Sequence, residues 1–449
     1  MATRSAANIP CKLATLRERS KPWEIIVGGR RQNTVIYRLS PSEVAQMSHD
    51  ATEPGIHSEG TAVTPEVPRS NIASIAVPIR APGALGFLTL VCLVTSAHAQ
   101  SGRNISSDSV VPGSSQPCPR TQMSMAGMPK PAMPTIPVAT SVAASDTSTS
   151  LVIRPDPADQ ITCRQDAVRT LSDVVFSTRA LPDGNQLRLL MDIQIPTSPR
   201  RRHPLIVYVP GGGFMAARKE GALDLRTYVA GSGFIVASIE YRTMLNGAIF
   251  RDGVADVKSA IRYLRANAQT YGVDTKRVAV WGESAGGYLV SMVGVTNGVK
   301  SYDIGNDLDQ NSDVQAVIDK YGPSELAKIA ADFNPELQAA YATNNPFLRY
   351  MDGVEKSVAN PITYVKASDP PFLIFHGSQD RMVSPTQTLV LHNALRRVGA
   401  RSTRYVLEGA GHGDLAFFGD FESGLPWSTR QTTGIMLDFL KHALAEGTY

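Results

Sequence analysis

From residue 165 onward the chain alternates short β-rich runs with amphipathic helical stretches, and no other feature constrains its fold as strongly. Runs such as 204–209 are continuously apolar, which is typical of strands that helices cover on both faces. Strands that alternate with helices predict a mainly parallel sheet of the α/β class. The predicted strands span 171–178, 186–194, 204–209, 234–240, 277–282, 314–321, 371–377 and 403–409, and the predicted helices lie near 219–230, 253–270, 285–295, 385–398 and 429–446.

The order of these elements also predicts where chemistry would occur. No helical pattern separates the first two predicted strands, so we expect them to form an antiparallel hairpin at one edge of an eight-stranded sheet. Open α/β sheets place their ligands at the carboxyl ends of the strands. Candidate functional residues are therefore those in the loops that follow strands.

One such loop carries a nucleophile pattern. The strand at 277–282 runs directly into Gly282-Glu283-Ser284-Ala285-Gly286, and a helical run follows. This is the G-x-S-x-G pattern in its strand–turn–helix context, where small neighbours let the strand and the helix approach closely. Because a free serine hydroxyl is a poor nucleophile, the turn must present it to a base. Ser284 is the predicted nucleophile.

The base and its orienting acid should follow in the order serine, acid, histidine, each after a strand. The strand at 371–377 is followed by Asp380, and the strand at 403–409 is followed by His412. We expect His412 to take the serine proton and Asp380 to hold its imidazole in the required tautomer. Of the other histidines, His376 is expected to brace the turn that carries Asp380, whereas His392 and His442 fall in helical patterns.

The strand at 204–209 ends in Pro210 and three consecutive glycines. Glycine-rich loops after strands bind phosphate, turn tightly, or direct backbone N–H groups at a developing negative charge. The G-x-G-x-x-G spacing of dinucleotide-binding folds is absent from this stretch. Its position upstream of the Ser284 turn favours the third role.

Several stretches together carry a family resemblance: VYVPGGGF, IEYR, WGESAGGYLV, YGPSEL, FHGSQDRMV and GAGHG, spread over residues 187–444. They resemble the secreted α/β-hydrolase carboxylesterases of the acetyl-esterase and feruloyl-esterase-like type, near the hormone-sensitive-lipase group. The resemblance implies an α/β-hydrolase fold with a small or absent cap, and hydrolysis of short-chain or polysaccharide-linked esters without cofactor or metal. The site residues that it implies are the triad Ser284, Asp380 and His412, and an oxyanion hole formed by Gly212, Gly213 and Ala285.

The chain departs from the family pattern at one position. The glycine loop of the family commonly begins with histidine, whereas this chain has Pro210, which removes a donor and fixes φ. The hydrogen bonds of that histidine must therefore be replaced or lost. Asp256 matches an acidic family position and is expected to play a structural role beside the serine turn. The insert at 322–365 is expected to form a small flap at most.

Other functions compete with ester hydrolysis. A serine peptidase or amidase uses the same triad, and a non-catalytic hydrolase-like binding module uses the same fold. The intact serine, acid and histidine argue against the binding module. The net charge of +4 without a long basic stripe argues against a nucleic-acid partner. We therefore expect a small-molecule or polysaccharide ester as the partner; the oligomeric state is left open.

A segment before the predicted domain looks like a secretory signal. Arg80 precedes a ten-residue apolar run at 85–94, and Ala97-His98-Ala99 forms a small-x-small cleavage site. The apolar run is too short to span a membrane. We expect a signal peptide at 77–99 and export to the periplasm or the medium. Residues 1–76 would then lie outside the natural product, with a start at Val77; a buried apolar helix in a genuine N-terminal domain is the alternative.

Residues 100–164 are rich in Ser, Pro, Thr, Ala and Met and are predicted to be a linker, so that the catalytic domain covers 165–449. Cleavage after Ala99 would leave two cysteines, Cys118 and Cys163. In an oxidising compartment they can pair, which would tie the linker to the domain. A disulfide and two free thiols both remain open at this point.

Overall fold

The computed structural model describes residues 115–119, 149–332, 338–339, 342–343, 345, 347–351, 355–380, 382–413 and 424–445, and four strands before residue 92. The chain divides into two compact units, Met1–Asn104 and Ile105–Tyr449. In the first unit, β1 (Trp23–Val27) pairs antiparallel with β2 (Val35–Leu39), and β3 (Ser74–Ala81) with β4 (Ala84–Val91).

The predicted signal segment overlaps these last two strands. Residues 84–91 form a strand, so the alternative of a buried helix at this place is wrong. The signal peptide at 77–99, its cleavage and the start at Val77 stay predictions.

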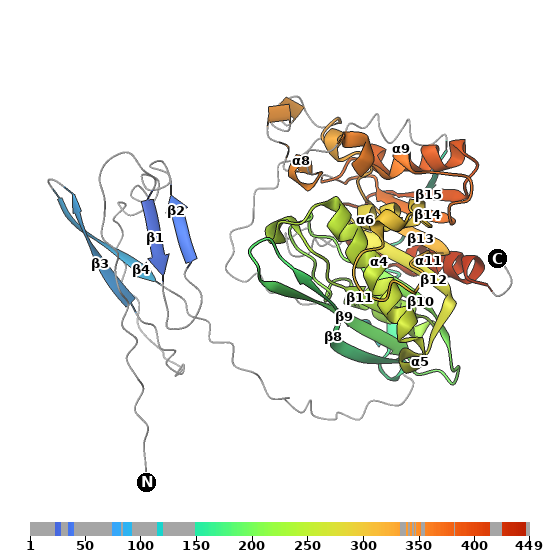
Figure 1. Cartoon of the computed structure of the whole chain (residues 1–449). Helices are drawn as coiled ribbons and strands as arrows, with labels where there is room; N and C mark the ends of the chain where they lie inside the picture. The colour runs from blue at the N-terminus through green and yellow to red at the C-terminus, as the bar shows by residue number, and fades with distance from the viewer. Residues whose placement is uncertain are drawn as a thin grey trace, which may run out of the picture. The chain divides into compact units, whose positions relative to one another are not determined.

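A nine-stranded sheet forms the centre of the second unit, in the order β6-β15-β14-β13-β12-β10-β11-β9-β8 (Figure 1). Neighbours from β6 to β11 are parallel, whereas β9 pairs antiparallel with β11 and β8. The strands are β6 (Leu151–Ile153), β8 (Val168–Ala180), β9 (Gln186–Pro196), β10 (His203–Val209), β11 (Ile235–Ile239), β12 (Val273–Glu283), β13 (Ala316–Lys320), β14 (Phe372–Gly377) and β15 (Ser402–Leu407). The mainly parallel sheet and its antiparallel edge hairpin are thus confirmed.

Helices cover both faces of this sheet, as the apolar strands predict. They are α3 (Leu223–Gly231), α4 (Phe250–Ala266), α5 (Ala268–Tyr271), α6 (Ala285–Val295), α8 (Phe347–Tyr350), α9 (Pro385–Arg397) and α11 (Arg430–Ala443). Short 3₁₀ turns connect some of these elements: η2 (Gln165–Ala167), η3 (Met244–Asn246), η4 (Lys300–Tyr302), η5 (Leu326–Lys328), η6 (Lys356–Ala359), η7 (Pro361–Thr363) and η9 (Leu425–Ser428).

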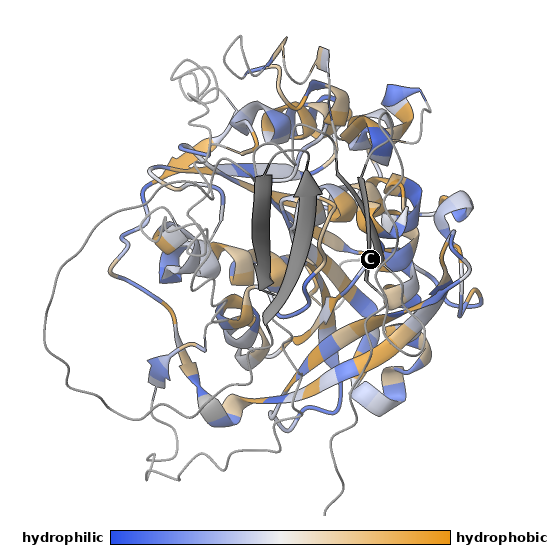
Figure 2. Cartoon of the chain, turned by 90° about the vertical axis from the view of Figure 1, so that its left-hand side faces the viewer, coloured by the Kyte–Doolittle hydropathy of each residue, from blue (hydrophilic) through white to orange (hydrophobic). Residues whose placement is uncertain are grey.

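The alternation of side chains along β10 shows how the core is divided. Leu205, Val207 and Val209 pack in a cluster with apolar residues of α4, α6 and α9. Ile206 and Tyr208 point to the other face, where α3 and α11 supply the apolar contacts. Because successive side chains of a strand face opposite ways, a strand between two helical layers must be apolar throughout. In Figure 2 the strands are accordingly rich in hydrophobic residues, whereas the helices carry both kinds.

The structure corrects the predicted linker and the number of strands. Residues 149–164 belong to the domain: β6 adds a ninth strand beside β15, and Gln160 forms a bridge with Thr429. Three paired residues are too few to show a hydrophobic period, so composition dominated the prediction. Among the described residues no helix is both long enough and apolar enough to cross a membrane.

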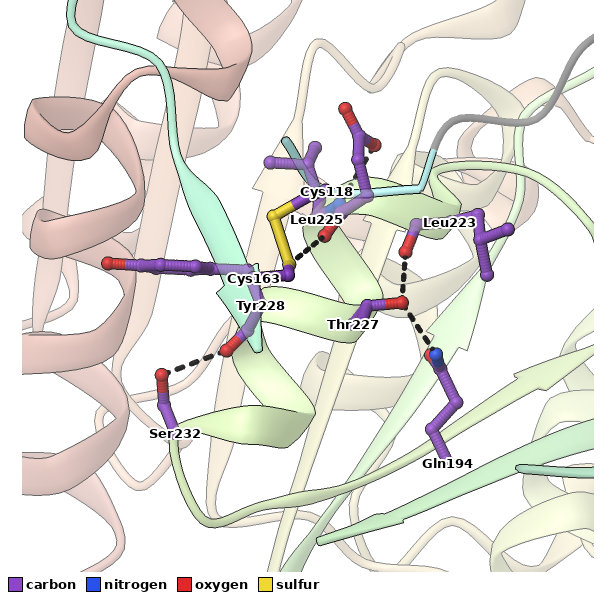
Figure 3. The surroundings of a disulfide bond; sticks show 9 residues. Cys118, Cys163, Gln194, Leu223, Leu225, Thr227, Tyr228 and Ser232 are labelled. Atoms are coloured by element: carbon purple, nitrogen blue, oxygen red, sulfur yellow. Dashed lines mark hydrogen bonds between the residues drawn. A yellow bond between two sulfur atoms is a disulfide. The ribbon is translucent and has the colours of Figure 1, made fainter. Parts of the chain in front are cut away.

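The two cysteines of this region are joined. Cys118 and Cys163 form a disulfide with a Cα–Cα distance of 4.7 Å. Both lie against α3, where Leu225 is a neighbour (Figure 3). Their flanking residues pair as two short strands, β5 (Ser115–Pro117) and β7 (Thr162–Arg164). The disulfide, one of the two open alternatives, is the one that the structure contains.

Candidate active site

Ser284 lies in a strained turn between β12 and α6. Its backbone has φ 54° and ψ −119°, a conformation that L-residues rarely adopt. A Cβ at Gly282 would overlap the carbonyl of Gly286, and a Cβ at Gly286 would overlap the carbonyl of Val209. Both glycines are therefore required sterically, as the motif predicts.

His412, in the loop after β15, faces the serine. Its Nε2 lies 2.8 Å from Oγ of Ser284, and its Nδ1 lies 2.7 Å from Oδ2 of Asp380. A carboxylate only accepts, so Nδ1 carries the proton and Nε2 is free to accept the serine proton. The fold thus brings together the three predicted residues, which are separated by 128 and 32 positions in the chain.

Asp380 is buried in the turn after β14, with four donors around it. Its Oδ1 accepts the N–H groups of Met382 and Val383 at 2.8 and 2.9 Å. Its Oδ2 lies 2.7 Å from His412 and 3.1 Å from Nε2 of His376. Burial alone would raise the pKa of this carboxyl, but its interactions with His412 and His376 hold that pKa below its usual range. Asp380 is consequently an anion at neutral pH.

Two aromatic residues pack around His412, and the sequence interpretation assigned no role to either. The ring of Tyr321 lies 4.6 Å from the imidazole and 4.7 Å from the ring of Trp427, measured between centroids. The indole N–H of Trp427 donates to the carbonyl of Gly411 at 3.1 Å, next to the histidine. Tyr321 has φ 46°, a strained value for a residue with a Cβ. No local pattern in the sequence marks these contacts.

A buried ion pair lies beside Ser284. Nζ of Lys320 is 2.9 Å from Oε1 of Glu283, the residue that precedes the serine. The same ammonium lies over the rings of Trp427 and Trp281, at 5.0 and 5.5 Å from their centroids. The carbonyl of Lys320 also accepts the backbone N–H of Ser284 at 2.9 Å. These contacts attach the serine turn to β13.

The glycine loop lies directly against the serine turn. A Cβ at Gly211 would come within 3.1 Å of the Ser284 Cβ. Gly212 has φ 137° and Gly213 has φ 60°, values that favour glycine, and a Cβ at Gly212 would overlap the carbonyl of Ala216. Within the described residues, the backbone N–H groups of Gly212, Gly213 and Ala285 donate to no protein acceptor. They are therefore available to an oxygen at this place.

Pro210, the departure from the family pattern, is buried, and its carbonyl has a partner. The hydroxyl of Tyr241 donates to that carbonyl at 3.0 Å and lies 3.5 Å from the carbonyl of Ala216. Burial raises the pKa of Tyr241, which keeps this hydroxyl protonated. Tyr241 thus connects the two ends of the glycine loop, a contact that a proline permits because it uses only the carbonyl.

The acidic residue and the other histidines discussed in the sequence analysis lie outside the triad. Asp256 is fully buried and forms ion pairs with Arg179 at 3.0 Å and Arg242 at 2.9 Å. His392 is buried between Ser402 and the carbonyl of Thr149, while His442 is exposed on α11. The expected brace is confirmed for His376, which contacts both Asp380 and the carbonyl of Val383.

Part of the predicted flap contacts the glycine loop. The ring of Tyr350, in α8, stacks on that of Phe214 with centroids 4.4 Å apart, and Phe347 makes an edge contact at 5.8 Å. The insert at 322–365 also includes residues that lie outside the described part of the chain. The flap itself stays a prediction.

Comparison with known proteins agrees with this architecture. The BD-FAE family model matches residues 191–395, which contain Ser284 and Asp380 but not His412. A solved structure titled a truncated form of carbohydrate esterase from gut microbiota is 27% identical, with a TM-score of 0.53; the match covers 63% of this chain and 99% of that one. The domain has the α/β-hydrolase fold.

Curated proteins similar to this α/β-hydrolase domain are named esterases. Esterase LipC of Mycobacterium tuberculosis is 31% identical over 51% of this chain and 58% of its own length. Isoprenylcysteine alpha-carbonyl methylesterase ICME of Arabidopsis thaliana is 27% identical over 53% of this chain and 56% of its own length. The chain therefore spans only a little more than half of each of these relatives.

Proposed function

We propose that this α/β-hydrolase is a serine carboxylesterase that works through an acyl-enzyme. The observation that carries the proposal is the continuous hydrogen-bond chain from Asp380 through His412 to Ser284, beside a loop with free N–H groups. The names of the related esterases support the same reaction class.

In the first half-reaction, Oγ of Ser284 attacks the ester carbonyl while Nε2 of His412 takes the hydroxyl proton. The carbonyl oxygen becomes an oxyanion, which Gly212, Gly213 and Ala285 bind through their N–H groups. Removing one such donor typically costs about 3 kcal/mol of transition-state stabilisation. The intermediate collapses, its C–O bond breaks, and His412 returns the proton to the departing alcohol.

In the second half-reaction, His412 deprotonates a water molecule that attacks the acyl carbonyl. The same N–H groups bind the second oxyanion. Its collapse releases the carboxylic acid and returns the proton to Ser284. The anionic Asp380 stabilises the imidazolium that forms in both halves.

The proposed substrates are short-chain esters or acetyl- and feruloyl-type esters attached to polysaccharides. The similarity to a structure titled a carbohydrate esterase supports this class. The proposed location is outside the cytoplasm. The signal-like segment at 77–99 and the Cys118–Cys163 disulfide support export, because disulfides persist mainly in oxidising compartments.

Hydrolysis of p-nitrophenyl acetate, butyrate and longer esters tests the proposal, with wild type compared against Ser284→Ala. Ser232→Ala is the matched control, since Ser232 is an exposed serine at the end of α3. We expect the first variant to be inactive and the control to match wild type. Equal rates for wild type and Ser284→Ala would disprove the triad's role. Faster cleavage of a peptide p-nitroanilide than of the esters would favour the peptidase alternative.

A further inference from the structure

One carboxylate oxygen of Asp380 contacts two histidines. His412 contacts Oδ2 at 2.7 Å, and Nε2 of His376, on β14, contacts the same oxygen at 3.1 Å. Nε2 of His376 also lies 2.9 Å from the carbonyl of Val383. Both neighbours of this nitrogen only accept hydrogen bonds, so His376 must carry a proton at Nε2.

The other ring nitrogen of His376 has a different environment. Its Nδ1 lies 2.8 Å from Oγ1 of Thr388, on α9. That hydroxyl accepts Nε of Arg404 at 3.0 Å, and Nη1 of the same buried arginine donates to Ser150 at 2.8 Å. The same hydroxyl lies 3.2 Å from the carbonyl of Pro385, which also accepts Nη2 of Arg404 at 2.8 Å, so Thr388 can donate its proton either to that carbonyl or to the imidazole.

The partners of His376 hold its ring in one orientation. Nε2 donates toward Oδ2 of Asp380 and the carbonyl of Val383, while Nδ1 contacts the Thr388 hydroxyl. The buried guanidinium of Arg404 donates to that hydroxyl and fixes its position. The Nε2–H is therefore directed at Asp380 whatever group holds the Thr388 proton.

We infer that His376 is a positioning residue for the proposed reaction: its Nε2–H holds Oδ2 of Asp380 toward His412, and Thr388 with Arg404 keeps the imidazole ring in that orientation. This inference rests on the proposed function. It extends the hydrogen-bond chain from the triad to β15, which carries Arg404, and to Ser150 before β6. The four donors fill the lone-pair positions of Asp380, so this carboxylate has little freedom to rotate.

Three variants test the inference. His376→Leu removes the donor, His376→Gln restores an amide donor of similar reach, and Thr388→Val removes the hydroxyl at almost unchanged volume. We expect kcat for p-nitrophenyl acetate to fall about tenfold in His376→Leu, equivalent to about 1.4 kcal/mol in the barrier, with KM unchanged. His376→Gln should recover most of this loss, and Thr388→Val should show a smaller loss in kcat.

The matched control is His203→Leu. His203 is also a buried histidine with a partner at each ring nitrogen, but it lies at the start of β10, and its partners are the carbonyls of Gly233 and Arg200. We expect this variant to lose stability in thermal unfolding while kcat stays at the wild-type value. An equal loss of kcat in both leucine variants would overturn the inference, as would an unchanged kcat in a folded His376→Leu.

A spectroscopic readout separates this inference from the proposed function. In the resting protein, the N–H proton between His412 and Asp380 should give the most downfield imidazole resonance in the proton NMR spectrum, because that bond is short and charge-assisted. We expect it to shift in His376→Leu, to return in His376→Gln and to stay in His203→Leu. An unchanged chemical shift of this resonance in His376→Leu would refute the positioning role. Absence of esterase activity in wild type, with these shifts present, refutes only the proposed function.

Discussion

Replacing Cys118 and Cys163 with serine removes the disulfide that joins β5 to β7. The cross-link closes a loop with a sequence separation of 45 residues. In the chain-entropy model a loop of this length stabilises the folded state by about 4 kcal/mol. For a domain of this size we expect the unfolding midpoint to fall by about 6 °C.

The measured loss of unfolding free energy depends on how firmly the segment around Cys118 is held without the disulfide. Residues 115–119 are held by three residue pairs with β7 and by the buried side chain of Cys118. If this segment detaches as a unit when the cross-link is lost, the rest of the sheet persists and the measured loss is smaller. About 4 kcal/mol is therefore the upper limit of the loss in unfolding free energy.

Guanidinium unfolding of wild type, the double variant and the reduced wild type measures the effect. The reduced protein keeps both sulfur atoms, so it separates the cross-link from the change of side chain. Peptide mapping without reductant that finds Cys118 and Cys163 as free thiols, or equal midpoints before and after reduction, would refute the reasoning.

Three further predictions concern the site and its support. Gly286→Ala, whose Cβ would overlap the backbone, should abolish activity or folding, whereas Gly434→Ala, with open space around it, should raise the thermal midpoint slightly. Tyr241→Phe frees the carbonyl of Pro210 and should lower kcat for p-nitrophenyl acetate about threefold to tenfold, from the loss of about 1 kcal/mol of hydrogen bonding, with KM little changed. Burial raises the pKa of Asp319 to about 7, against the opposing effects of Gly322, Ser291 and Arg404. The folded state therefore holds a proton that the unfolded state loses above about pH 4, so the unfolding free energy of wild type should fall between about pH 4 and 7. In denaturant titrations at several pH values, Asp319→Asn should reduce that slope by up to about 1.4 kcal/mol per pH unit.

Elements whose signal is local were predictable from the sequence. The apolar strands, the turn at Ser284 and the loops that carry Asp380 and His412 each appear within a short window of residues. The eight predicted strands lie within a few residues of their observed bounds. A strand buried on both faces is recognisable because all its residues are apolar. A turn in which a strand and a helix approach closely is recognisable because it needs glycine at fixed positions.

Contacts between distant segments were decided only by the tertiary structure. β6 is recognisable as a strand because β15 pairs with it, and Cys118 has its partner because β5 lies along β7. The contact of Tyr241 with Pro210 and that of His376 with Asp380 depend on which loops meet at the carboxyl ends of the strands. Such contacts produce no periodic pattern in the sequence, because each is a single pair of residues. The two residues of a pair meet only when the whole domain has folded.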